Sequence, residues 1–132
     1  MELIGGETTP GPDGKGDNVI HATVHWALDG DGAAVQYSQD FSLPSGVRFA
    51  DDFHVFWTEW TPTFLAIGVD DVSYYNITLA GTSVIPEFER ATASPLFWIL
   101  NVAVGGDWGG DVDQTTVFPQ TMLVDYVRVF QM

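Results

Sequence analysis

Residues 52–79 decide the fold, and they read DFHVFWTEW, TPT, FLAIGV, DD and VSYYNITL in succession. Three apolar stretches of strand length are separated by Thr-Pro-Thr and by Asp-Asp, which are residue types that favour tight turns. Along the first stretch the side chains alternate, with Trp57 and Glu59 on one side and Thr58 on the other, which is the period of a strand. The sequence therefore predicts a meander of short antiparallel strands.

Strand patterns continue on both sides of this meander. Residues 19–27 (VIHATVHWA) alternate and place His21 and His25 on the face opposite their apolar neighbours. Residues 96–104 (LFWILNVAV) are apolar on both faces, which is typical of a strand buried inside a sandwich. Residues 121–130 (TMLVDYVRVF) alternate again. The chain is thus predicted to be built from strands from one end to the other.

The remaining segments add no second domain. A helical pattern is confined to residues 85–94 (IPEFERATAS), where Pro86 suits the first turn. Gly and Pro gather in residues 5–16 and 105–119, which we predict to be loops. The sequence has no internal repeat and no linker, and 132 residues suit one domain. We predict a single all-β domain over residues 1–132, most simply a sandwich.

The amino-acid composition limits the kinds of molecule that the chain is expected to bind. Four Lys and Arg against 18 Asp and Glu give a formal net charge of -14, which repels phosphate backbones and argues against nucleic acid. Such an acidic surface suits a neutral ligand or a cation. No apolar run approaches the ~18 residues of a membrane span, and the first residues lack the basic stretch of a signal peptide. The chain has no Cys, so no disulfide framework or Cys-ligated metal is expected.

Several stretches together resemble one known family, in the order in which that family has them. They are MELIGG (1–6), HATVHW (21–26), DDFHVFWTEWTP (51–62), PLFWILNVAVGGDWGG (95–110) and VFPQTMLVDYVRVFQ (117–131). The chain is similar to the C-terminal part of glycoside hydrolase family 16, the laminarinase and β-glucanase group. The resemblance implies a concanavalin-like jelly-roll β-sandwich, partial or rearranged because the family's N-terminal strands are missing. It also implies an endo-acting β-glucan hydrolase.

The resemblance assigns one catalytic residue. The family's catalytic strand resembles Glu-Ile-Asp-Ile-Met-Glu, with the nucleophile first and the general acid/base last, and a retaining glycosidase holds two such carboxyls about 5–5.5 Å apart. Met1 and Glu2 match the end of this motif, so Glu2 is expected to be the acid/base. The nucleophile has no counterpart in the sequence, so we expect the chain alone to be inactive or weakly active. The alternatives are a non-catalytic β-glucan-binding module and a structural remnant without a ligand.

Substrate-binding residues are expected in the family's cleft. The resemblance places His25 there, where an imidazole can hydrogen-bond sugar hydroxyls. Trp26 and Trp108 are candidate sugar platforms, because the C–H face of a glucose ring packs on an indole. Trp108 stands in GGDWGG, where a core Trp would be unusual, whereas Trp26 shares a face with apolar residues. Asn101 interrupts an apolar strand, so it is either a structural hydrogen-bonding residue or a cleft residue.

Other residues have plainer interpretations. For His21 a structural role and a cleft position both remain open, and Trp57, Trp60 and Trp98 lie in apolar strands that favour the core. No cofactor is expected to be required. The resemblance nevertheless suggests Asp125 as the ligand of a structural calcium ion that backbone oxygens would complete.

The resemblance also suggests partners and a location. The expected ligand is a β-glucan or a related polysaccharide, and the expected location is extracellular or periplasmic. Missing strands would leave apolar surface and open sheet edges, so we expect self-association that covers them.

Overall fold

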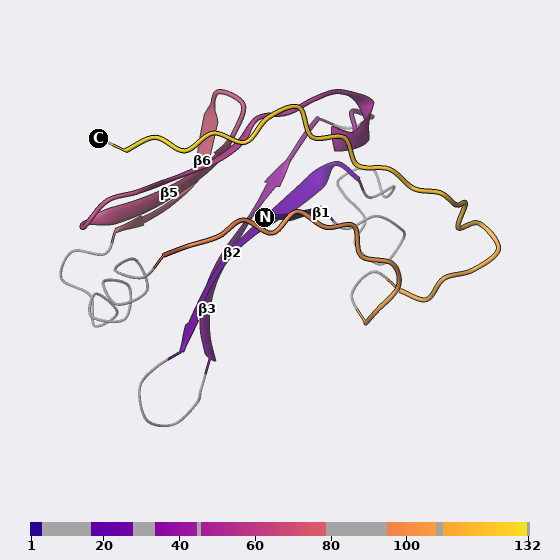
Figure 1. The fold of residues 1–132 in the computed structure, drawn as a ribbon, viewed down its shortest axis with the longest axis horizontal. Helices are drawn as coiled ribbons and strands as arrows, with labels where there is room; N and C mark the ends of the chain where they lie inside the picture. Colours follow the sequence, from indigo (N-terminus) through magenta and orange to yellow (C-terminus); the bar gives the residue numbers. More distant parts are fainter. Residues whose placement is uncertain (4–16, 28–33, 45, 79–94, 108–109, 132) are drawn as a thin grey trace.

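The computed structural model describes residues 1–3, 17–27, 34–44, 46–78, 95–107 and 110–131. Within these ranges the regular structure consists of six strands, arranged as two three-stranded antiparallel sheets, and one 3-10 turn (Figure 1). The predicted all-β class is therefore confirmed, and the two sheets form part of a β-sandwich. The helix predicted at 85–94 lies outside the described residues. No helix in the described part is long and apolar enough to cross a membrane.

The first sheet has the order β1-β2-β3. β2 (Val19–Ala27) pairs along its whole length with β3 (Ala34–Ser42), from Val19 opposite Ser42 to Ala27 opposite Ala34. β1 is only Glu2–Leu3 and pairs with the other edge of β2. The long β2–β3 ribbon is the indigo-to-purple hairpin of Figure 1.

The second sheet is the meander that the sequence predicted. It contains β4 (Phe56–Trp60), β5 (Phe64–Val69) and β6 (Val72–Thr78), in that order. The turn between β4 and β5 is closed by the Thr61 N–H, which donates to the Phe64 carbonyl over 2.8 Å. The turn between β5 and β6 is Asp70-Asp71, and Asp70 has a φ of 50°, a left-handed conformation that Asp tolerates.

A β-bulge interrupts the regular alternation of β6. Ser73 pairs with Gly68 and Tyr75 pairs with Ile67, so that Tyr74 is the extra residue. As a result Tyr74 and Tyr75 both pack against the buried core, although they are neighbours in the sequence.

The core lies between the two sheets and forms two clusters. Ile20, Phe49 and Val69 make the first, and Ala22, Leu65 and Ile67 make the second. The even-numbered residues of β2 thus meet the odd-numbered residues of β5, which confirms the predicted alternation of β2. As the central strand, β5 is also covered on its outer side, where Gly68 lies under the indole of Trp57.

A short turn supplies Phe49 to this core. The 3-10 turn η1 (Phe49–Asp51) follows Arg48, whose guanidinium donates to the Asp17 carboxylate over 2.7 Å. The Phe49 N–H in turn donates to the Asp17 carbonyl over 2.9 Å. These two bonds fix the start of the turn against the chain that enters β2.

The C-terminal part differs from the prediction. The predicted strands 96–104 and 121–130 form no strand, and no backbone hydrogen bond joins either of them to another described segment. Their apolar side chains are exposed, up to 80% for Phe97 and 83% for Phe130, and Trp98 is exposed instead of lying in the core. An apolar segment becomes a strand only beside a partner strand that takes its backbone hydrogen bonds, and no described strand pairs with either of these segments.

Candidate functional site

Three polar residues form a row across the first sheet. Glu2 on β1 stands opposite His21 on β2, and His21 stands opposite Asp40 on β3. Residues directly opposite each other in antiparallel strands project to the same face, with their Cβ atoms about 4.5–5.5 Å apart. The His21 Nδ1 lies 2.7 Å from the Asp40 Oδ1. A carboxylate only accepts hydrogen bonds, so the ring donates through Nδ1.

Burial differs along this row. His21 is 8% exposed, whereas Glu2 and Asp40 are exposed. The three residues lie on the outer face of the sheet, because the core contacts come from the alternate residues Ile20 and Ala22. His21 is therefore held by Asp40, a partner that sequence reasoning missed. The available signal was a lone carboxylate near the end of the strand pattern AVQYSQDFS.

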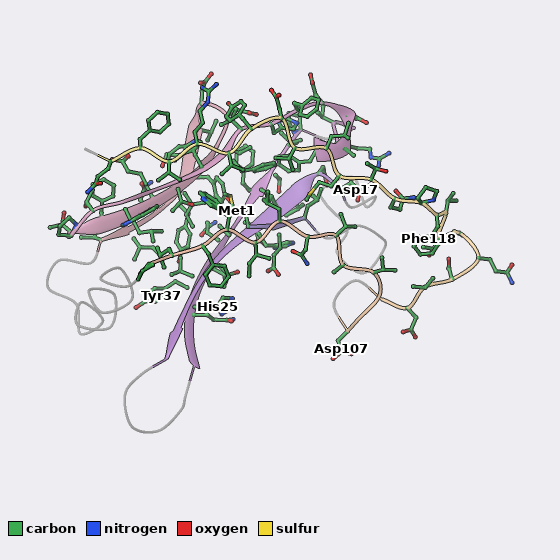
Figure 2. The ribbon with its side chains drawn as sticks, viewed as in Figure 1. Met1, Asp17, His25, Tyr37, Asp107 and Phe118 are labelled. Atoms are coloured by element: carbon green, nitrogen blue, oxygen red, sulfur yellow. The ribbon has the colours of Figure 1, made fainter. Side chains whose placement is uncertain are left out.

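The same face continues as a polar strip along β2 and β3. Beyond the first row, Thr23 faces Ser38 and His25 faces Gln36. His25 is exposed and lies four residues from His21, which is roughly 13 Å along a strand. The structure thus brings Glu2 and His25 to one face of one sheet, and Figure 2 shows His25 on the β2–β3 ribbon.

The other candidate residues do not join this face in the described structure. Asn101 lies in the segment without a strand partner and is exposed. The backbone of Trp26 is in β2, opposite Val35, but its side chain lies outside the described part. Trp108 lies outside the described residues altogether. In Figure 2, Asp107 and Phe118 on the C-terminal chain lie well apart from His25. The sugar-binding roles of these residues stay predictions.

The calcium prediction rests on Asp125 alone. Asp125 is exposed in the segment that forms no strand, and the described residues contain no group of three His, Asp or Glu side chains able to hold a metal ion. Calcium takes six to eight oxygen ligands, so Asp125 fits a calcium ion only with oxygens from elsewhere. Its role as a ligand stays a prediction.

A second His–Asp pair lies in the other sheet. The His54 Nδ1 is 2.8 Å from the Asp70 Oδ2, and the Val55 N–H donates to the Asp70 Oδ1 over 2.9 Å. Partial burial acts to raise the pKa of Asp70, but the hydrogen bonds from His54 and from the Val55 N–H outweigh it, so that the pKa is lowered. The His54 and Phe49 rings meet in a T-shaped contact, with their centroids 5.1 Å apart. The pair ties the chain before β4 to the β5–β6 turn, so its role is structural.

Comparisons with known proteins fit this architecture. The chain is 35% identical over 123 residues to the β-glucanase of Rhodothermus marinus, a match that covers 89% of the chain and 41% of that enzyme. It is 30% identical over 122 residues to glucan endo-1,3-β-glucosidase A1 of Niallia circulans, covering 89% of the chain and 17% of that protein. The third relative is the clotting factor G alpha subunit of Tachypleus tridentatus, 30% identical over 112 residues, with 85% and 15% covered.

No family model matches the chain, and no solved structure matches it. The chain spans less than half the length of each of these three relatives. Fold and relatives together indicate an all-β sandwich that is related to glucan hydrolases. The relatives are consistent with the resemblance that the motifs suggested, to part of a glycoside hydrolase family 16 domain of the β-glucanase and laminarinase group.

Proposed function

We propose that the chain binds β-glucan on the outer face of its first sheet, with Glu2 as the general acid/base of a β-glucan hydrolase. The observation that carries this proposal is the similarity to two glucanases over 89% of the chain. The same sheet presents Glu2 and His25 on one face. The proposal extends to an extracellular or periplasmic location and to Asp125 as a ligand of a structural calcium ion.

The polar strip on this face supports sugar binding. Its rows end in Asp40, Ser38 and Gln36 on β3, which supply hydroxyl, amide and carboxylate groups. Such groups hydrogen-bond the hydroxyls of a neutral sugar, and a net charge of -14 does not oppose a ligand without charge. The opposite face of the sheet is taken up by the core, so a ligand would bind on the polar side only.

The same geometry argues for weak hydrolysis or none by these residues alone. A glycosidase that retains the anomeric configuration needs a second carboxyl group about 5–5.5 Å from the first. Asp40 is the nearest carboxylate in the row, but it lies two strands away from Glu2, at roughly 9–10 Å between backbones, and it is bonded to His21. Double displacement therefore lacks a nucleophile in the described sheet. This observation favours the second candidate function, a non-catalytic β-glucan-binding module.

Reducing-end release from laminarin and from mixed-linkage β-glucan, with calcium present, separates the two candidates. Glu2→Gln should abolish any turnover, while Glu59→Gln is the matched control, because Glu59 is an exposed strand glutamate of the other sheet. Binding to the same glucans is measured in parallel. Binding without turnover would establish the binding module, and neither binding nor turnover would refute both candidates and leave the structural remnant.

We further propose that a second copy of the chain covers the exposed C-terminal segments. Residues 96–104 and 121–130 carry rows of exposed apolar side chains. Their free backbone groups suit strand pairing between two copies.

A further inference from the structure

We propose that the Asp40–His21 pair is a positioning device for Glu2, so that Glu2, His21 and Asp40 act as one coupled row. This inference rests on the acid/base role of Glu2 proposed above. It adds two residues to that site, since neither His21 nor Asp40 has been assigned a part in it.

The strand register places Glu2 directly opposite His21. Glu2 has a single pairing partner in the sheet, which is His21. Directly opposite residues hold their Cβ atoms about 4.5–5.5 Å apart on the same face. An imidazole at that separation is close enough to interact electrostatically with a carboxyl group. Glu2 is exposed at the sheet edge, so its own strand does little to fix its side chain.

The pair between His21 and Asp40 holds the His21 ring in place. With its Nδ1 2.7 Å from the Asp40 carboxylate, the His21 ring is fixed in orientation, and its Nδ1 carries the proton. His21 is also 8% exposed, so the ring has little freedom to turn away. Asp40 therefore determines which face and which nitrogen of the imidazole the neighbouring strand meets.

The acid/base chemistry proposed for Glu2 explains why fixed neighbours at His21 and Asp40 would matter. A general acid/base loses its proton in one half-reaction and regains it in the other, so its charge changes twice in each cycle. A fixed imidazole on the facing position of the next strand lies on the same face as this changing charge. His21 and Asp40 are thus positioning residues, and Glu2 is the group that touches substrate.

Among the described residues, the titratable groups around His21 and its partner Asp40 come from four strands. Glu2 faces it from β1 and Asp40 from β3, and His25 lies further along β2 on the same face. From β6, Tyr74 is close enough to Asp40 for that charge to contribute to its raised pKa. A test of the coupling must therefore remove Glu2 alone and leave the other three in place.

The test follows the ring nitrogens of His21 by ¹⁵N NMR over a pH titration of the full chain. Glu2→Gln is expected to shift the His21 titration curve, while Glu59→Gln leaves it unchanged. Because Glu2 is exposed at an edge, the variant retains its fold, which dispersed amide signals would verify. A His21 curve identical in wild type and Glu2→Gln would overturn the proposal. A second arm uses Asp40→Asn. In the wild type the His21 ring is expected to carry its proton on Nδ1, and in this variant that preference should weaken.

This readout is independent of turnover. A shifted His21 curve in a chain that neither hydrolyses nor binds glucan would keep the coupled row and refute the proposed function. An unchanged His21 curve in a chain that hydrolyses glucan would refute the coupled row and keep the proposed function. The two proposals can therefore fail separately.

Discussion

The His54 Nδ1 lies 2.8 Å from the Asp70 Oδ2, so the chain entering β4 is tied to the turn that ends β5. The same turn receives two further bonds, from the Val55 N–H to the Asp70 Oδ1 over 2.9 Å and from the Trp57 indole N–H to the Asp70 carbonyl over 3.0 Å. The Asp70 N–H donates back to the Val55 carbonyl. One residue in a left-handed conformation thus organises the whole edge of the second sheet.

We expect Asp70→Asn to lower the free energy of unfolding by about 1 kcal/mol at neutral pH, a figure reduced to allow for the exposure of the carboxylate. Because the pKa of Asp70 is lowered in the folded chain, its contribution is complete above the ordinary value of 3.8. It is lost as pH falls through the lower, folded value. Urea unfolding at neutral pH and near pH 3 checks this, with Asp71→Asn as the control. If the difference in unfolding free energy between wild type and Asp70→Asn were the same at both pH values, this prediction would be wrong.

Gly68→Ala should destabilise the second sheet by about 1–3 kcal/mol. A Cβ at this position would collide with the Trp57 indole and would lie 2.6 Å from the Val72 carbonyl oxygen. The indole can move, but the backbone oxygen cannot. Chemical denaturation of Gly68→Ala and of the double variant with Trp57→Ala separates the two contacts. If Trp57→Ala restored full stability to Gly68→Ala, the backbone clash would be refuted.

Tyr74→Phe is expected to stabilise the fold by about 1 kcal/mol, because the Tyr74 hydroxyl is buried and has no hydrogen-bond partner among the described residues. Burial, with the charge of Asp40, raises the pKa of Tyr74 to about 12. Wild type should therefore lose stability progressively above pH 10, where an unfolded tyrosine ionises and Tyr74 does not. The variant should show a smaller loss in thermal melts between pH 9 and pH 11. A variant less stable than wild type at pH 7 would show that the hydroxyl has a partner in solution.

Association of the chain should depend on the C-terminal segments and on salt. We expect sedimentation at micromolar concentration to show a dimer or larger species. Higher salt should strengthen it, because salt screens the repulsion between chains of net charge -14. Replacing Phe97 and Phe130 together by Glu should give monomers, whereas Phe53→Glu, at an exposed aromatic residue outside those segments, should not. A monomeric wild type at all salt concentrations would exclude the second copy as the covering partner.

The local part of the fold was predictable from the sequence. The Thr-Pro-Thr and Asp-Asp turns join neighbouring strands, so the meander depends on contacts close in sequence, and β5 and β6 formed where the pattern placed them. The alternation of β2 also gave its two faces correctly, because the sheet buries one and leaves the other polar. The register that sets Glu2 opposite His21 needed the structure, since a strand of two residues has no pattern.

The long-range part was not predictable in the same way. Residues 96–104 have the composition of a buried strand, but a strand depends on a partner that composition does not supply. The same reasoning made Trp98 a core residue, and it is exposed. The Asp40 and Asp70 carboxylates were overlooked because their histidine partners are 19 and 16 residues away in the sequence.

The bulge in β6 has a consequence for how this strand tolerates the loss of a residue. Deleting Tyr74 would leave Tyr75 opposite Ile67 and Ile77 opposite Leu65, so every later side chain would keep its side. Deleting Asn76 instead would turn Ile77 outward and interrupt the contact with β5. The middle of this strand therefore contains one position where the chain can be shortened without turning any later side chain to the other face. The deletion costs only the packing of Tyr74 itself, and thermal melts of the two deletions would compare the two effects.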